Sequence, residues 1–324
     1  MSTQWEVLLP AHIDPSGPAS IDDFARCTGM DEYADVADAL GDIGRYDAVI
    51  VRTTELDADV VERARRLQVI SKHGAGLDNV DVDAASRRGI VVCNTPGANA
   101  RSVAEHAMAL LFGVRRNLRT ADRHVRSGAW NRSTFAGHEL TGDVLGLFGF
   151  GAIAREVADL ARGMGQRVCT YDPYVADEDV PAGVERVADR LALFERADAV
   201  SVHAPLTSET RGVVSDEELH ALGPDGLLVN TARGEVVDEA ALVEALSGGR
   251  LGGAGLDTFA EEPPGEGHPL YARDDVLLTP HVGGVTAEAL ERMSRQAAAN
   301  VRTVYEGGLP ESTVNREALE EAGR

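Results

Sequence analysis

The sequence predicts an α/β protein with two doubly wound parallel sheets. Three observations predict this fold class. Short β-branched apolar runs recur along the chain, and amphipathic stretches such as residues 58–66 lie between them. Strands that alternate with helices form parallel βα units. The length of 324 residues is long for one compact domain and suits two.

The expected strands fall into two series. The first occupies residues 5–10, 47–52, 67–71 and 90–94, and a long helix is expected from about 102 to 127. The second series occupies residues 144–150, 167–172, 198–204, 226–232, 253–259 and 276–282. A last helix, from about 287 to 306, ends at two glycines, which stop helices.

The last helix has no strand left to pair with in the second series. We therefore expect it to return to the first series, which makes one domain discontinuous: residues 1–98 plus 285–324. Residues 99–284 form the second domain, inserted into the first. The connecting segments "NTPGAN" and "HVGGVT" carry the small residues that suit a hinge.

The charge balance excludes two classes of partner. Acidic residues number 53 against 31 basic ones, for a net charge of −22, and they are spread over the whole chain. Such a surface repels nucleic acid and anionic lipid, so we expect neither nucleic acid nor membrane as a partner. Lys72 is the only lysine. Dispersed acid with almost no lysine predicts adaptation to a salty cytoplasm, where salt screens the self-repulsion.

The cysteines and the N-terminus predict a cytoplasmic protein. Cys27, Cys93 and Cys169 are odd in number and widely spaced, without ligand-like histidine spacing, so we expect reduced thiols and no metal site. The N-terminus lacks the basic region followed by an apolar run that is typical of a signal peptide, so we expect none. The longest nearly apolar stretch, "VLGLFGFGAIA", is far short of the roughly 20 residues of a membrane span.

A glycine motif stands between an expected strand and an expected helix. Gly149, Gly151 and Ala154 form a GxGxxA pattern that permits a tight turn and the approach of backbone N–H groups to a pyrophosphate. Alone, the motif is weak evidence for a dinucleotide site. The next strand, however, ends at Asp172, whose carboxylate can bind both ribose hydroxyls. Asp172 would repel a 2′-phosphate and "YDPYVADED" has no basic residue, so the sequence favours NAD over NADP.

Three residues at strand ends suit the chemistry of a keto or hydroxy acid. Arg233, in "NTARGEVVD", can grip a carboxylate with two parallel hydrogen bonds. Glu262 precedes two prolines that fix the local backbone, and His281, in "TPHVGG", titrates near neutral pH. Each alone could be a surface arginine, a solvated carboxylate or a capping histidine. Their shared position after strands of one sheet favours a catalytic site.

Taken together, the motifs resemble the D-isomer-specific 2-hydroxyacid dehydrogenase family, and within it the phosphoglycerate dehydrogenase-like branch. The resemblance covers nearly the whole chain, through "VIVRTT", "GAGLDNVD", "NTPGANARSVAEH", "LGLFGFGAIA", "YDPY", "HAPLTSETRGVVS", "NTARGEVVDEAAL", "GAGLDTFAEEPP" and "TPHVGG". It implies two Rossmann-like domains, with an NAD-binding domain inserted into a discontinuous flavodoxin-like substrate domain.

The resemblance also implies roles. Arg233 binds the substrate carboxylate and polarises the keto group, Glu262 pairs with His281 and raises its pKa, and His281 exchanges the proton as hydride moves. Asp257 is expected near the nicotinamide carboxamide. The cofactor contacts implied by the matching motifs are Gly149, Gly151, Ala152, Ile153, Asp172, Ala204, Pro205, Thr231, Ala232, Arg233, Asp257 and His281.

Three positions depart from the family pattern. Ala152 stands where the family often has an arginine that touches the pyrophosphate, so cofactor binding would depend more on the backbone. Ala204 and Ala75 stand where phosphoglycerate dehydrogenases can have threonine.

The expected substrate contacts are Arg52, Lys72, Ala75, Gly76 and Arg233. In the family, the loop that matches residues 74–76 offers N–H groups to the substrate carboxylate, and a basic residue often stands at the position of Lys72. We interpret Lys72 and Arg52 as positive charge for an anionic substrate, one that can carry a second anion such as a phosphate. The alternative is that Lys72 is an accident of composition with a solvated head group.

The resemblance implies an NAD-dependent enzyme that acts on a small anionic D-2-hydroxy or 2-keto acid, with D-3-phosphoglycerate dehydrogenase favoured. Glyoxylate/hydroxypyruvate reductase is the alternative. An NAD-sensing corepressor-type binding protein is an alternative from another class, because such proteins can retain the catalytic residues. The family also implies a homodimer formed through the NAD-binding domain, with the 102–127 helix at the contact.

Overall fold

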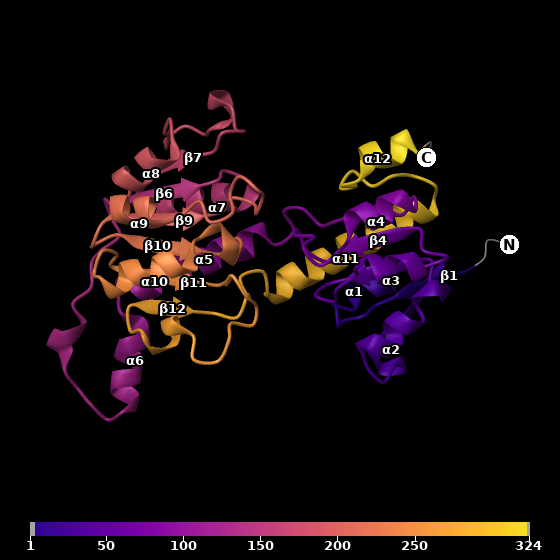
Figure 1. Ribbon diagram of the computed structural model, residues 1–324, viewed down its shortest axis with the longest axis horizontal. Helices are drawn as coiled ribbons and strands as arrows, with labels where there is room; N and C mark the ends of the chain where they lie inside the picture. Colours follow the sequence, from indigo (N-terminus) through magenta and orange to yellow (C-terminus); the bar gives the residue numbers. More distant parts are fainter. Residues whose placement is uncertain (1–3, 323–324) are drawn as a thin grey trace. The chain divides into compact units, whose positions relative to one another are not determined.

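The computed structural model describes residues 4–322, and the chain divides into two compact units. Unit 1 comprises Met1–Asn99 and Val285–Arg324, and unit 2 comprises Ala100–Gly284. Each unit contains one parallel sheet flanked by helices, which confirms the predicted fold class (Figure 1).

The sheet of unit 1 has five parallel strands in the order β2-β1-β3-β4-β5, which is the flavodoxin-like order. The strands are β1 (Trp5–Leu8), β2 (Ala25–Thr28), β3 (Ala48–Val51), β4 (Val69–Lys72) and β5 (Val91–Cys93). Strand β2 was not predicted from the sequence. It lies at the edge of the sheet and half of its residues are at least partly exposed, so it lacks the apolar run that marks the others.

Short helices connect these strands, and the two C-terminal helices return to the same unit (Figure 1). Ser71 Oγ on β4 donates to the Ala297 carbonyl at 2.9 Å, which fastens the long C-terminal helix to the sheet. A further short helix follows it and was not predicted. The helices are α1 (Ser16–Ala19), α2 (Val36–Gly41), α3 (Ala58–Arg63), α4 (Val82–Arg87), α11 (Ala287–Tyr305) and α12 (Arg316–Glu321).

The sheet of unit 2 has seven parallel strands in the order β12-β11-β10-β9-β6-β7-β8. The strand order reverses between β6 and β9, and in open α/β sheets ligands bind outside the carboxyl ends of the strands at such a point. The strands are β6 (Val144–Phe148), β7 (Arg167–Tyr171), β8 (Val184–Arg186), β9 (Ala199–Val202), β10 (Leu227–Asn230), β11 (Gly253–Leu256) and β12 (Val276–Leu278). The short edge strand β8 was not predicted.

Helices bury both faces of this sheet. Apolar residues of α5 (Ala100–Arg115) and α7 (Ala152–Gly163) pack with Leu145, Leu147 and Val229 on one face. Apolar residues of α8 (Arg190–Arg196), α9 (Asp216–Leu222) and α10 (Glu239–Ser247) pack with Val200 and Leu228 on the other. Alternate strand residues thus enter opposite cores, as the pleat of a strand requires.

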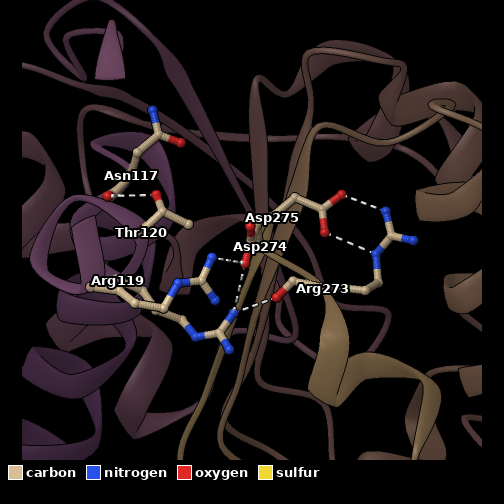
Figure 2. Close-up of polar contacts among 7 residues, drawn as sticks. Asn117, Arg119, Thr120, Arg273, Asp274 and Asp275 are labelled. Carbon is tan, nitrogen blue, oxygen red and sulfur yellow. Dashed lines mark hydrogen bonds and ion pairs between the residues drawn. The ribbon is translucent and has the colours of Figure 1, made fainter. Parts of the chain in front are cut away.

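The prediction of one helix over residues 102–127 is wrong. The segment forms two helices, α5 and α6 (Leu118–Arg126), separated at Asn117, whose φ of 52° is left-handed. Asparagine adopts this conformation more readily than most residues, and the helical pattern of the sequence continues through it. Helix α6 is fastened to the turn before β12: Arg123 pairs with Asp274 at 2.6 Å, and Arg119 donates to the Arg273 carbonyl (Figure 2).

Short 3₁₀ turns occur at Met30–Glu32, Ile43–Arg45, Arg132–Phe135, Asp177–Asp179, Gly234–Val236 and Pro269–Ala272. Within residues 4–322, the structure has no helix long and apolar enough to cross a membrane.

Candidate active site

The glycine motif forms the turn between β6 and α7. Gly149 has a φ of 89°, and a Cβ there would lie 2.7 Å from the Ala204 backbone nitrogen. Only glycine therefore fits. Gly151 precedes the first turn of α7, and within the described part of the chain no side chain caps that helix. Its first N–H groups and the positive end of its dipole suit a pyrophosphate.

Asp172, directly after β7, holds the glycine turn in place. Its Oδ2 atom accepts the Phe150 N–H at 2.8 Å, and its Oδ1 atom accepts the Tyr174 N–H at 2.9 Å. Both oxygens retain lone pairs for the ribose hydroxyls of a dinucleotide. The carboxylate therefore orients the turn and is itself oriented by it, a link that the sequence alone did not reveal.

A basic residue lies near Asp172, contrary to the expectation from the local sequence. Arg186, at the end of β8, places Nη2 3.4 Å from the Asp172 carbonyl oxygen and Nη1 2.7 Å from the carboxylate of Asp177. Sequence reasoning missed Arg186 because it did not predict β8, the strand that brings this residue beside β7.

The segments after β9 and β10 lie at the same edge of the sheet. Ala204 is buried against the glycine turn, and the Ala232 N–H donates to Asn230 Oδ1 at 3.0 Å. Among residues 4–322, the ring nitrogens of His203 and the Thr231 hydroxyl are buried without a hydrogen-bond partner. Burial lowers the pKa of His203 to about 3, so the imidazole is neutral. His203 was not predicted as a site residue. Of the remaining predicted cofactor contacts, Ala152 and Pro205 are exposed and Ile153 is half-buried.

Arg233 stands in the turn after β10. The Asn230 side chain donates to the Arg233 carbonyl at 2.9 Å, and the half-buried guanidinium donates to the Ala232 carbonyl at 2.8 Å. The next residue, Gly234, lies so close to Phe259 that a Cβ would be 1.9 Å from its carbonyl carbon. The arginine turn is therefore packed directly against the segment that carries Glu262.

Glu262 and His281 form the predicted pair. His281 Nδ1 lies 2.7 Å from Glu262 Oε2, and Glu262 Oε1 accepts the Phe259 N–H at 3.1 Å. The two side chains are 48% and 38% exposed, so the pair faces the outside of unit 2. With Nδ1 on the carboxylate, Nε2 is the ring nitrogen that can exchange a proton with a ligand.

Asp257 anchors the turn that carries His281. Its carbonyl accepts the His281 N–H at 2.8 Å, and its buried carboxylate accepts hydrogen bonds from four groups: the N–H groups of Val282 (2.9 Å) and Gly283 (2.7 Å), the Thr279 hydroxyl (2.6 Å) and His106 (3.3 Å to Nε2). Burial by itself would raise the pKa of Asp257, but these hydrogen bonds outweigh it and hold the pKa at about 2. Sequence reasoning did not find His106 or Thr279, because the contacts join separate segments.

The predicted substrate residues of unit 1 lie at the carboxyl ends of β3 and β4: Arg52 follows β3, Lys72 is the last residue of β4, and Ala75 and Gly76 follow it. Lys72 Nζ donates to the Arg52 carbonyl at 2.6 Å and to the Asn79 side chain, so protein oxygen atoms hold the ammonium. The Gly74 N–H donates to Thr95 Oγ1 at 2.9 Å, and the Ala75 carbonyl accepts from Asn94 at 2.7 Å. These bonds fix the glycine-rich loop that continues to the half-buried Gly76.

Within the range 4–322, no three or more His, Cys, Asp and Glu residues are grouped so that they could hold a metal ion. The three cysteines are free thiols.

The carboxyl ends of one sheet thus carry both a glycine turn bound to an acidic residue and a histidine–glutamate pair. Residues 108–283 match the model of the D-isomer specific 2-hydroxyacid dehydrogenase NAD-binding domain. The chain belongs to the D-isomer specific 2-hydroxyacid dehydrogenase family, as its motifs indicated, and this segment is its NAD-binding domain.

Relatives with curated descriptions include D-3-phosphoglycerate dehydrogenases. The protein of Mycobacterium tuberculosis is 40% identical over 314 residues, which cover 95% of this chain and 58% of that protein. The protein of Archaeoglobus fulgidus is 37% identical over 303 residues, which cover 92% of this chain and 58% of that protein. The chain thus spans less than two thirds of the length of these relatives.

Solved structures share the fold. A Thermus thermophilus protein matches with a TM-score of 0.86 at 35% identity, covering 95% of this chain and 99% of that one. An NADPH-dependent glyoxylate/hydroxypyruvate reductase of Sinorhizobium meliloti matches with a TM-score of 0.85 at 30% identity, covering 96% of this chain and 98% of that one.

Proposed function

We propose that the protein is an NAD-dependent D-2-hydroxyacid dehydrogenase that interconverts D-3-phosphoglycerate and 3-phosphohydroxypyruvate. The contact of 2.7 Å between His281 and Glu262 carries the proposal, because it supplies an oriented acid/base at the same end of the sheet as the arginine turn and the nucleotide turn. Similarity to D-3-phosphoglycerate dehydrogenases over 95% of the chain supports this choice of substrate.

Each of the three residues has one task in the reaction. When bound, NAD supplies or accepts the hydride. The guanidinium of Arg233 holds the substrate carboxylate and polarises the keto oxygen. His281 gives its Nε2 proton to that oxygen during reduction and takes it back during oxidation. Glu262 keeps the imidazole oriented and stabilises its protonated form.

The cofactor contacts divide by position along the sheet edge. We assign the pyrophosphate to the turn at Gly149 and Gly151, together with Ala152 and Ile153. Asp172 takes the adenosine ribose, with Ala204 and Pro205 beside the adenosine. Thr231, Ala232 and Asp257 belong to the nicotinamide end, where the buried, unpartnered Thr231 hydroxyl within residues 4–322 is a group that a ligand can satisfy.

We assign unit 1 to the substrate and unit 2 to NAD. In unit 1, the N–H groups of Ala75 and Gly76 take the substrate carboxylate, and Arg52 with Lys72 takes the second anion. Positive charge at this point of an acidic protein attracts a doubly anionic substrate more than a singly charged one.

The experiment is NADH oxidation in molar-salt buffer with 3-phosphohydroxypyruvate, hydroxypyruvate and glyoxylate. We expect a kcat/KM for the phosphorylated acid at least about tenfold above the others, the effect of one additional ion pair. Preference for the small acids would instead make the protein a glyoxylate/hydroxypyruvate reductase, the activity named for the structurally similar Sinorhizobium meliloti protein. NADH binding without turnover of any acid would indicate a corepressor-type binding protein.

We further propose a cytoplasmic homodimer that forms through unit 2. Helix α6 and the segment after it expose the apolar residues Leu118, Val125 and Trp130 at 55%, 53% and 74%, which a second copy would cover. Trp130→Arg should convert the dimer to a monomer in size-exclusion chromatography with light scattering. Val314→Arg, at an exposed apolar residue of unit 1, is the control and should leave the dimer intact. A wild-type monomer would contradict the proposal.

A further inference from the structure

We propose that Glu239 and His268 form a positioning pair that holds residues 259–264 in the conformation in which Glu262 meets His281. This inference rests on the proposed function of the Glu262–His281 pair. Neither residue touches that pair directly, and the sequence did not mark either one as a site residue.

Glu239 binds one group inside the segment and one residue that follows it. Its Oε1 atom lies 2.7 Å from His268 Nε2, and its Oε2 atom accepts the Ala260 N–H at 3.3 Å. Glu239 is the first residue of α10, and the helix is capped by the Asp238 carboxylate, which accepts the Ala241 N–H at 3.1 Å. The carboxylate of Glu239 is therefore carried by a helix that packs against the sheet.

The hydrogen bonds of His268 select one tautomer. Its Nδ1 atom accepts the Leu270 N–H at 3.4 Å, at the start of a 3₁₀ turn whose Leu270 is fully buried. Nε2 must then carry the proton of the neutral ring and donate it to Glu239. The two side chains are 13% and 24% exposed, so this pair is shielded far better than the pair of Glu262 and His281.

Three contacts fasten the segment that bears Glu262. Glu239 binds the Ala260 N–H, the Phe259 ring packs edge-on against His268 with ring centres 6.1 Å apart, and Tyr271 Oη donates to the Pro264 carbonyl at 3.0 Å. Glu262 lies between these points. Its own carboxylate completes the arrangement by accepting the Phe259 N–H at 3.1 Å.

The fastening is needed because the catalytic pair is exposed. An ion pair between solvated side chains typically contributes about 0–1 kcal/mol, and its members sample many geometries. A carboxylate keeps one geometry when its backbone segment is fixed by a network shielded from solvent. Residues in the outer shells of metal and catalytic sites orient histidines in the same way. We therefore assign the orientation of Glu262 to Glu239 and His268.

The test compares His268→Ala and Glu239→Ala with His268→Gln, which keeps an N–H donor near the position of Nε2. Glu266→Gln, at an exposed carboxylate two residues beyond that segment, is the matched control. The measurements are the pH dependence of kcat for reduction of 3-phosphohydroxypyruvate, the Kd of NADH by fluorescence, and the titration of His281 by NMR.

The alanine variants should lower kcat about tenfold and move the pH midpoint of reduction and the NMR titration midpoint of His281 to lower pH. NADH affinity should stay within about twofold of the wild type, and His268→Gln should recover most of the loss. Glu266→Gln should match the wild type. An unchanged His281 titration in both His268→Ala and Glu239→Ala would overturn the positioning role.

The two proposals fail separately. A wild-type protein without turnover would overturn the proposed function, whereas the NMR titration of His281 tests the positioning pair without any substrate. Where an alanine variant does not fold, Glu239→Gln replaces it in the comparison, because it removes the carboxylate that accepts from His268. A merely structural role would change the melting temperature but leave the His281 titration of the folded variants where it is in the wild type.

Discussion

Glu262 and His281 approach to 2.7 Å across 19 residues of sequence, and each is fixed by a different neighbour. The Phe259 N–H orients the glutamate, while the Asp257 carbonyl accepts the His281 N–H at 2.8 Å. Because Phe259 and Asp257 both follow β11, one strand end sets the position of both partners. The geometry of the pair therefore depends on this strand more than on the two exposed side chains.

The first prediction concerns the charge of Glu262. Glu262→Gln keeps an acceptor for the Phe259 N–H but removes the negative charge beside His281, so the protonated imidazole loses its stabilisation. We expect kcat for keto-acid reduction to fall about 100-fold at pH 8 and much less at pH 6, because acid restores the proton. The pH dependence of kcat measures this. Glu261→Gln, at the exposed neighbour, should leave the profile unchanged, and two parallel profiles for wild type and Glu262→Gln would contradict the role.

The second prediction concerns stability and Asp257. Its pKa of about 2 lies below the ordinary value of 3.8, so the ionised group stabilises the fold above about pH 4, and the contribution is lost as pH falls toward 2. Asp257→Asn should lower the free energy of unfolding by about 2 kcal/mol at pH 7. The difference from wild type should shrink between pH 4 and pH 2.

Urea unfolding at several pH values measures that difference directly. Asp59→Asn, at an exposed carboxylate of α3 in unit 1, serves as the control and should show little difference at any pH. A gap between wild type and Asp257→Asn that stays constant down to pH 2 would mean that the asparagine disturbs packing rather than charge.

The third prediction concerns the choice of cofactor. Asp172→Ser removes the carboxylate that would repel a 2′-phosphate, and Arg186, 3.4 Å from the Asp172 carbonyl, remains to attract one. We expect the Kd of NADH to rise about tenfold and that of NADPH to fall, measured by fluorescence titration. Adding Arg186→Met should abolish the gain for NADPH. If the double variant binds NADPH as well as Asp172→Ser does, Arg186 has no part in the selection.

Much of the site could be predicted because its residues belong to local motifs. The Gly149 turn, the acidic end of β7 and the residues at the ends of β10, β11 and β12 each have a signature within a few positions of sequence. Periodicity likewise located the longer, buried strands. Local patterns of this kind are produced by the backbone and by the nearest layer of packing. They can therefore be recognised in the amino-acid sequence alone.

The features that were missed depend on conformation or on distant contacts. Asn117 breaks a helical pattern with a single left-handed residue, and β8 is a three-residue edge strand with two exposed members. Because β8 was not predicted, Arg186 was not recognised as a neighbour of Asp172. The network around Asp257 joins α5 to the turn after β12, and the pair of Glu239 with His268 joins α10 to a loop. No spacing in the sequence encodes such contacts.

The last prediction concerns the role of Lys72, the only lysine in the sequence. Lys72 donates to the Arg52 carbonyl and to Asn79, so its ammonium has a structural task in addition to any contact with substrate. A role of the Lys72 charge in substrate binding and a role of Lys72 in the stability of its loop predict different effects on KM. If the charge attracts a phosphate, Lys72→Ala should raise KM for 3-phosphohydroxypyruvate about tenfold and leave KM for glyoxylate within about twofold, since glyoxylate has no second anion.

Asn79→Ala separates the two roles, because it loosens the ammonium without removing its charge. We expect Asn79→Ala to change KM for the phosphorylated acid by less than about threefold, and Arg52→Ala to act on the same substrate as Lys72→Ala does. Steady-state kinetics with both acids measure all of these effects. Equal increases of KM for the two acids in Lys72→Ala, reproduced by Asn79→Ala, would assign the lysine to the stability of its loop, and the second anion would then depend on Arg52 alone.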